Sequence, residues 1–330
     1  MLTIKEIAER ANVSRTTVSR VINNSGYVSE DAKRRVLKVI EETGYVPSEN
    51  AKSLRTKKTK VIGVILPKIS TETSSRLVKG LDEVFAKEGY QILLANTNLI
   101  PEKEIEYLKL LKSRHVDGII LSATNVNPLL VEEIYQLKIP FVTVGQYISG
   151  LVNVLFEDYQ ASKDMVNLLI HKGYKAIAFI GVTEKDRSVG YLRKAGYLDA
   201  MRENQLLVEE SWVQTGIFDV DSGYESMKTI METANVKPDA VLTVTDRLAI
   251  GAMQYMNETG MSVPDDIAVA GMGSSEMGKY ISPPLTTVDF SIEDAGREAA
   301  GLLLDQINGK NYSEVIKTIK YRLLERSSIQ

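Results

Sequence analysis

Polar side chains that can contact nucleic acid are concentrated near the N-terminus of the chain. Five of them fall mostly on one face of a helix expected over residues 14–23: Arg15, Thr16, Ser19, Arg20 and Asn23. The opposite face is apolar and carries Val18, Val21 and Ile22. Guanidinium groups suit guanine edges and phosphate oxygens, and short hydroxyl and amide groups suit both bases and phosphates. This pattern predicts a helix that reads nucleic acid, and a small helical bundle with a polar surface is the alternative.

Capping signals place this helix second in a group of three. Thr3 and Glu6 form the T-x-x-E capping box of a first helix, and Ser14 is a good N-cap for the second. Ser29 is a good N-cap for a third helix. Because the first two helices are short and closely connected, we expect a small all-α helix-turn-helix head over residues 1–46.

The charge of the chain is distributed unevenly. Residues 1–60 carry 13 Lys and Arg against 7 Asp and Glu, whereas the remaining residues carry 27 against 36. A basic head on an acidic body predicts an anionic partner for the head alone, and nucleic acid is the leading candidate. A charged but inert N-terminal segment is the alternative that composition leaves open.

The chain lacks the residues of several common chemistries. It contains no cysteine and only two histidines, His115 and His171. Disulfides, zinc fingers, iron–sulfur clusters, cysteine nucleophiles and multi-histidine metal sites are therefore excluded, and we expect no metal and no cofactor. The N-terminus has no signal-peptide core, and no apolar run approaches the length of a membrane span. We therefore expect a cytoplasmic protein without a membrane partner.

From Val61 onwards the pattern changes to alternating strands and helices. Continuous apolar runs predict buried parallel strands in two successive sets: residues 61–67, 90–96, 116–122 and 140–145, then residues 176–181, 240–245 and 267–273. Two α/β halves in series predict a two-lobed body over residues 61–330. A ligand is expected where the carboxyl ends of its strands face a cleft.

Catalytic motifs are missing from this predicted body. The sequence contains neither the G-x-x-x-x-G-K-[ST] phosphate-binding loop nor the G-x-S-x-G nucleophile elbow. Carboxylates at predicted strand ends, such as Asp158, Asp246 and Asp289, occur without catalytic partners. We therefore expect a binding protein and no enzyme. A solute-binding protein and a sugar-modifying enzyme are the alternatives from other functional classes.

The head and the segment after it resemble the DNA-binding head and hinge of the LacI/GalR family of transcriptional regulators. The string TIKEIAERANVSRTTVSRVINNSGYVSEDAKRRVLKVIEETGYVPSENAKSLR carries the resemblance, which extends over essentially the whole chain. It implies that Arg15, Thr16 and Arg20 read the bases of double-stranded operator DNA. It also implies further DNA contacts from the second helix and the hinge: Ser14, Thr17, Ser19, Asn23, Asn50, Ala51 and Leu54.

The resemblance further implies how the rest of the chain is organised. A hinge segment covers residues 47–60, and its Leu54 wedges into a base step of the minor groove. The body has the periplasmic-binding-protein-like fold, with an N-lobe over about 61–159 and 289–319 and a C-lobe over about 160–288 and 320–330. Because two heads must match a two-fold operator, a homodimer is expected.

The candidate ligand residues fall after strand ends of the body: Gln146, Arg187, Arg193, Phe218, Asp246 and Gly273. The resemblance implies ligand contacts for Arg193, Phe218 and Asp246, with core packing as the alternative for Phe218 and helix capping for Asp246. Lys68 and Arg76 are added because the chain departs from the family pattern: Lys68 replaces an acid, and the stretch 271–274 lacks the usual ligand-binding aspartate. Fewer acids and more bases around one cleft predict an anionic ligand, because an unpaired buried charge is costly.

These features predict a repressor of a carbohydrate-utilisation operon that is controlled by a small sugar effector. A phosphorylated sugar is the leading candidate, and the trehalose- and sucrose-repressor branches of the family are the suspected likenesses. Two alternatives remain open: a repressor that responds to a neutral sugar, and a global catabolite regulator with a phosphoprotein co-regulator.

Overall fold

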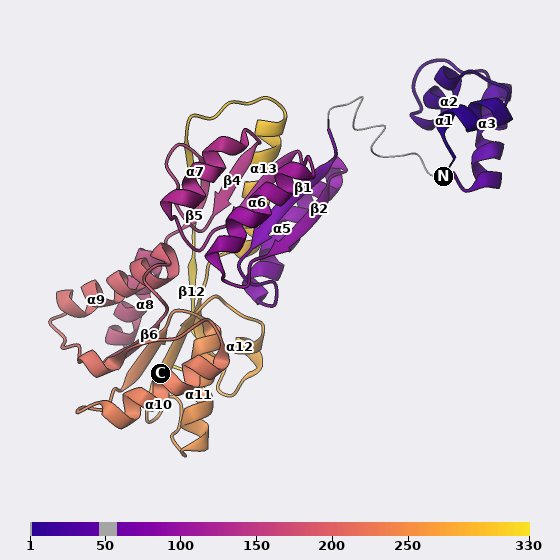
Figure 1. The fold of residues 1–330 in the computed structure, drawn as a ribbon. Helices are drawn as coiled ribbons and strands as arrows, with labels where there is room; N and C mark the ends of the chain where they lie inside the picture. The colour runs from indigo at the N-terminus through magenta and orange to yellow at the C-terminus, as the bar shows by residue number, and fades with distance from the viewer. Residues whose placement is uncertain (1, 46–57) are drawn as a thin grey trace. The chain divides into compact units, whose positions relative to one another are not determined.

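The computed structural model describes residues 2–45 and 58–330 of the chain. It contains two compact units, residues 1–60 and residues 61–330 (Figure 1). Each unit has its own hydrophobic core. Within the described ranges, no helix is both long enough and apolar enough to cross a lipid bilayer.

Three helices form the N-terminal unit: α1 (Ile4–Arg10), α2 (Arg15–Ile22) and α3 (Glu30–Thr43). Their boundaries follow the predicted capping signals, since Thr3 and Glu6 form a reciprocal capping box at α1. The hydroxyls of Ser14 and Ser29 accept hydrogen bonds from backbone N–H groups at the starts of α2 and α3. Gly44 ends α3 in the left-handed conformation, with a φ of 61°. The helices enclose a small core of Ile7, Ala8, Ala11, Val18 and Val36.

The first lobe of the body is built on a parallel six-stranded sheet with the order β11-β5-β4-β3-β1-β2. Its strands are β1 (Val61–Leu66), β2 (Gln91–Asn96), β3 (Gly118–Ser122), β4 (Phe141–Val144), β5 (Val152–Phe156) and β11 (Val315–Ile319). The helices packed with it are α5 (Glu72–Phe85), α6 (Pro101–Ser113), α7 (Pro128–Leu137) and α13 (Ile292–Ile307) (Figure 1). The central strands β1, β3 and β4 are almost wholly buried, which explains why they read as continuous apolar runs.

The second lobe repeats this design with the strand order β12-β10-β9-β8-β6-β7, in which only β12 runs antiparallel to its neighbour. Its strands are β6 (Ile177–Gly181), β7 (Val213–Thr215), β8 (Ala240–Thr243), β9 (Ala268–Met272), β10 (Thr286–Asp289) and β12 (Arg322–Leu324). Its helices are α8 (Asp158–His171), α9 (Arg193–Glu203), α10 (Val220–Thr233), α11 (Asp246–Glu258) and the short α12 (Met277–Tyr280). A single π-helical segment, η2 (Arg187–Leu192), precedes α9. The predicted two-lobed α/β body is therefore confirmed.

Helices α5 and α13 of the first lobe are packed unusually close together. A Cβ atom added at Gly80 would lie 2.1 Å from the carbonyl oxygen of Glu293, and one at Gly296 would lie 2.4 Å from that of Leu77. Only glycine allows this approach of the two backbones. The close packing fixes α5, whose first turns reach the edge of the first lobe that faces the second.

The chain crosses between the lobes three times: after β5, after β10 and after β11. Each crossing contributes one aromatic ring, from Phe156, Phe290 and Tyr321. The ring centroids of Phe156 and Phe290 are 5.7 Å apart, and those of Phe290 and Tyr321 are 6.4 Å apart. The three connections therefore meet in one aromatic cluster between the sheets.

Candidate functional site

Helix α2 of the head presents the predicted base-reading side chains to solvent. Arg15, Thr16 and Arg20 are exposed, whereas Val18 is fully buried in the head core. In the described part of the head, ion pairs occupy other basic residues, such as Arg35 with Asp31, and none involves Arg15 or Arg20. The two α2 guanidinium groups are therefore available to an external anion or base edge.

The other predicted DNA-contacting residues of α2 also organise the helix itself. Ser14 caps α2 by accepting from the backbone N–H of Thr17, and the two side-chain hydroxyls lie 2.9 Å apart. The Nδ2 group of Asn23 donates to the carbonyl oxygen of Ser19 at 2.6 Å. The predicted hinge contacts Asn50, Ala51 and Leu54 lie outside the described residues.

The body contains a cavity of about 500 Å³ between its two lobes. Loops at the carboxyl ends of strands in both sheets line it, together with the crossing residues Phe156 and Phe290. This position, between the carboxyl ends of parallel strands, is where α/β folds bind small ligands. The predicted residues Lys68, Gln146, Arg193, Phe218, Asp246 and Gly273 all line the cavity.

Arg193 lies in the cavity wall as half of a buried ion pair. It is 7% exposed, and its Nη2 and Nε atoms lie 2.6 and 2.7 Å from Oδ1 of Asp158. Its Nη1 donates to the carbonyl oxygen of Val244, and its guanidinium lies 4.4 Å from the ring centre of Phe290. Asp158 thus neutralises the charge of Arg193, and the ion pair adds no net charge to the cavity wall.

Two contacts join the lobes on one side of the cavity. Gln146, in the loop after β4 of the first lobe, is buried and donates to the Asp186 carboxylate of the second lobe at 2.8 Å. The hydroxyl of Ser188 donates to the carbonyl oxygen of Gly145. Burial raises the pKa of Asp186, and its hydrogen bonds with Val189 and Gln146 oppose that rise.

Asp246 organises another wall of the cavity. It is 3% exposed and accepts hydrogen bonds from the hydroxyl of Thr287 and from the backbone N–H of Ser275. Burial raises the pKa of Asp246. Thr245, and not Asp246, caps α11 through its side chain, and Asp246 holds the loop after β9 in place. In that loop Gly273 has a φ of 139°, a conformation that side-chain-bearing residues rarely adopt.

Two of the predicted effector-binding cations, Arg187 and Arg76, lie outside the cavity lining. Arg187 does not line the cavity, because its side chain is exposed and lies over the ring of Tyr191, with 5.3 Å to the ring centre. Arg76 does not line it either, because α5 directs its guanidinium towards Gly273, Ser274 and Asp289.

The sequence analysis did not predict one of the cations that line the cavity, Arg247. Arg247 lines the cavity from the first turn of α11, and its position directly after Asp246 is the only signal that pointed to it. Lys68 and Arg247 both act on the carboxylate of Asp219, whose pKa is lowered: burial raises it, but hydrogen bonds from Ser222 and these two charges outweigh that effect.

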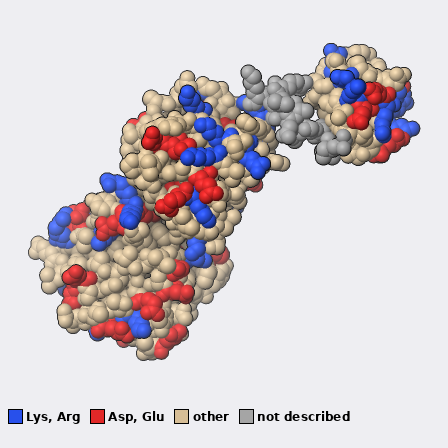
Figure 2. Space-filling view, viewed as in Figure 1, with Lys and Arg blue, Asp and Glu red and all other residues tan. Residues whose placement is uncertain are grey.

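The charges of the cavity are therefore mixed and do not form a cationic pocket. The lining cations are Lys68, Arg193 and Arg247, and the lining carboxylates are Glu72, Asp158, Asp186 and Asp246. Positive and negative side chains also alternate over the face of the body shown in Figure 2. Of the predicted cations, Lys68 and Arg193 line the cavity, whereas Arg76 and Arg187 do not.

Comparison with known proteins gives the family of both units. Residues 3–48 match the model described as bacterial regulatory proteins of the lacI family, and residues 166–329 match a periplasmic binding protein-like domain. The chain is 35% identical to the HTH-type transcriptional regulator RegA of Clostridium saccharobutylicum over 98% of both chains. It is 32% identical to catabolite control protein A of Priestia megaterium over 99% of both.

Solved structures agree with this assignment. A complex of the transcriptional regulator CelR with cellobiose has a TM-score of 0.76 and 28% identity, covering 99% of this chain and 100% of that one. The lac repressor dimer bound to operator and the anti-inducer ONPF has a TM-score of 0.86 at 23% identity, covering 99% of this chain and 98% of that one, which shows the shared fold. The relatives are regulators of transcription, as predicted, and not enzymes. The chain belongs to the LacI family of bacterial transcriptional regulators.

Proposed function

We propose that this protein is a homodimeric repressor that binds operator DNA through α2 and is released from it, or recruited to it, by a small neutral sugar in the interlobe cavity. The observation that carries the proposal is an interlobe cavity with mixed charges in the same chain as a helix with two exposed arginines that form no ion pair with described residues. Among its relatives, CelR is a transcriptional regulator solved with a sugar, cellobiose. The DNA-bound relative is a dimer.

The cavity favours a neutral ligand over a phosphorylated one. A phosphate dianion needs two or more unpaired cations, because desolvating its charge is costly. Arg193 is already neutralised by Asp158, so the remaining lining cations, Lys68 and Arg247, are outnumbered by the other lining carboxylates, Glu72, Asp186 and Asp246. A sugar, in contrast, offers hydroxyl donors to the lining carboxylates and an apolar ring face to Phe218 and the crossing aromatics.

The head supports recognition of DNA in the major groove. Exposed arginines on the second helix of a helix-turn-helix are placed as direct readers of bases in such motifs. Residues 1–60 supply the positive charge for phosphate attraction, while the body is acidic. We therefore assign base reading to Arg15, Thr16 and Arg20.

Calorimetry on the full chain tests the choice of ligand by comparing a neutral disaccharide with its 6-phosphate. We expect tighter binding of the neutral sugar and an operator affinity, measured by fluorescence anisotropy, that changes when it is added. Lys68→Ala serves as the matched control, because the anionic alternative predicts that it abolishes a preference for the phosphate. A preference of the wild type for the 6-phosphate that Lys68→Ala removes would return the protein to the anionic alternative.

A further inference from the structure

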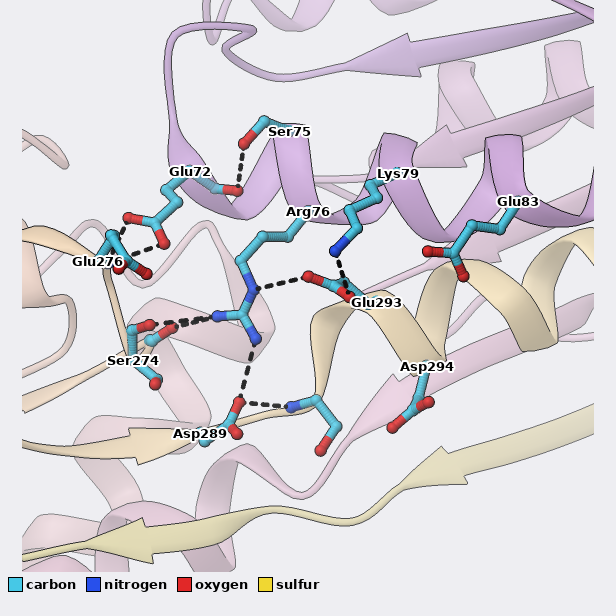
Figure 3. A network of polar contacts seen from close by, with 12 residues as sticks. Glu72, Ser75, Arg76, Lys79, Glu83, Ser274, Glu276, Asp289, Glu293 and Asp294 are labelled. Atoms are coloured by element: carbon cyan, nitrogen blue, oxygen red, sulfur yellow. Dashed lines mark hydrogen bonds and ion pairs between the residues drawn. The ribbon is translucent and has the colours of Figure 1, made fainter.

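Arg76 joins the two lobes through a network of polar contacts (Figure 3). From α5 of the first lobe, its Nη1 donates to the carbonyl oxygens of Gly273 and Ser274 in the second lobe at 3.2 and 3.3 Å. Its Nη2 lies 3.3 Å from a carboxylate oxygen of Asp289, the last residue of β10. One half-buried guanidinium therefore contacts a loop and a crossing segment that lie about two hundred residues away in sequence.

Asp289 extends this contact to a second crossing. Its other carboxylate oxygen accepts from Arg322 at 2.8 Å, and Arg322 begins β12 immediately after the chain returns to the second lobe. The backbone N–H of Ser291 also donates to Asp289 at 3.0 Å. Asp289 is 7% exposed, so it is largely shielded from water. Helix α5 and two of the three crossings are thus bound to one carboxylate.

A parallel contact reinforces the same junction. The carboxylate of Glu72, one turn before Arg76 on α5, accepts from the backbone N–H of Glu276 at 2.7 and 2.8 Å (Figure 3). The loop held in this way, residues 273–276, supplies Gly273 and Ser275 to the cavity wall. The first turns of α5 therefore hold a cavity-lining loop that belongs to the other lobe.

We propose that Arg76 is a positioning residue: by bridging loop 273–276 and Asp289, it keeps the lobes in the arrangement that forms the cavity. Arg76 does not line the cavity. It acts through the loop and the crossings, because a change in the angle between the lobes must break its contacts with both Gly273 and Asp289. Any effect of Arg76 on operator affinity rests on the proposed function. Its effect on the arrangement of the lobes does not depend on that function.

The interlobe distance measures this role directly, without a ligand or DNA. The natural chain has no cysteine, so spin labels can be attached through Lys87→Cys in the first lobe and Asn257→Cys in the second, both of which are exposed. Pulsed electron resonance then gives the distribution of distances between the lobes. We expect one narrow population in the labelled wild type, and in Arg76→Met a shift of roughly tenfold towards other arrangements, which corresponds to about 1.4 kcal/mol.

Lys79→Met is the matched control. Lys79 lies on the same helix, one turn on, and pairs with Glu293 at 3.1 Å, a contact within the first lobe. The Lys79→Met variant should leave the distribution of interlobe distances unchanged. Arg76→Lys keeps the charge but replaces the planar fork of the guanidinium with a single ammonium on a shorter side chain. It should shift the distribution in the same direction as Arg76→Met, and it provides the test if Arg76→Met does not fold.

An unchanged distribution in a folded Arg76 variant would overturn the proposal, as would an equal change in Lys79→Met. Operator binding by the labelled wild type is measured separately. If the wild type fails to bind an operator, the proposed function is wrong, but the distance measurement still decides the role of Arg76.

Discussion

The buried pair of Arg193 and Asp158 provides a quantitative test of how the cavity is built. In Asp158→Leu, the guanidinium keeps only the carbonyl oxygen of Val244 and the ring of Phe290, and neither neutralises its charge. The side chains of the pair are 8% and 2% exposed, so water does not screen them. Removing one partner of a buried pair typically destabilises a protein by about 3–5 kcal/mol, and we expect a loss of unfolding free energy in this range.

The double variant Asp158→Leu/Arg193→Met separates charge from packing. Apolar groups of similar volume often replace a buried ion pair with little loss of stability, or with a gain of about 1–4 kcal/mol. We therefore expect the double variant to regain most of what Asp158→Leu loses, with a coupling energy of about 2–3 kcal/mol. Its cavity loses the polar wall that we assign to the sugar, so sugar binding should remain weak although the fold is restored.

Urea unfolding followed through Trp212, the single tryptophan of the chain, measures these differences in the body. Trp212 is buried in the second lobe, as the pair is. Arg202→Met is the control, because Arg202 pairs with Asp199 on the same helix but is 74% exposed, and such pairs contribute about 0–1 kcal/mol. If Asp158→Leu loses no more stability than Arg202→Met, the pair is not desolvated and the reasoning fails.

Three further outcomes are expected. Arg20→Ala should weaken specific operator binding by roughly 1–3 kcal/mol and random DNA far less in a competition anisotropy assay; equal losses would make Arg20 a phosphate contact only. Burial raises the pKa of Glu104 from 4.5 to about 7 despite hydrogen bonds from Asn125 and Thr124, so it contributes stability that is present in acid and lost as the pH rises towards 7. Urea unfolding of the wild type should lose roughly 3 kcal/mol between pH 5 and 8, and Glu104→Gln should lack that decline; the same decline in both would assign it to other groups. Arg187→Ala should leave sugar affinity measured by calorimetry unchanged, since Arg187 lies outside the cavity, and a large loss would restore the sequence-based assignment.

Local rules account for what could be predicted from the sequence. The caps at Thr3, Ser14 and Ser29 depend on residues three positions apart, so the helices of the head begin where the sequence indicates. The central strands of each lobe are buried on both faces and read as uninterrupted apolar runs. Strands β5, β7, β10, β11 and β12 were not predicted. Strands β7 and β12 have only three residues, and polar residues interrupt the other three, such as Asn153 in β5, Thr286 in β10 and Lys317 in β11.

The direction of a long side chain depends on contacts that the local sequence does not contain. Arg76 was assigned to the ligand because it follows the cavity loop in sequence, but its partners Gly273 and Asp289 come from distant segments. Arg187 begins a π-helical segment, and its side chain lies over the ring of Tyr191 in the same segment, whereas its neighbours Ser188 and Val189 line the cavity. The effector type and the sucrose or trehalose branch remain predictions for the same reason, since both rested partly on these cations.

Two aromatic residues of the crossing segments line the cavity, so a bound ligand can affect the movement of the lobes. Phe156 and Phe290 line the cavity, and each belongs to a segment that crosses between the lobes. A ligand shifts a conformational equilibrium only by the difference in its affinity for the two states. Contacts on the crossing rings must change when the lobes turn about those segments, whereas contacts on one lobe alone move with that lobe and contribute no difference. Ligand groups that reach Phe290 should therefore carry most of the coupling, which is typically about 1–3 kcal/mol in such regulators.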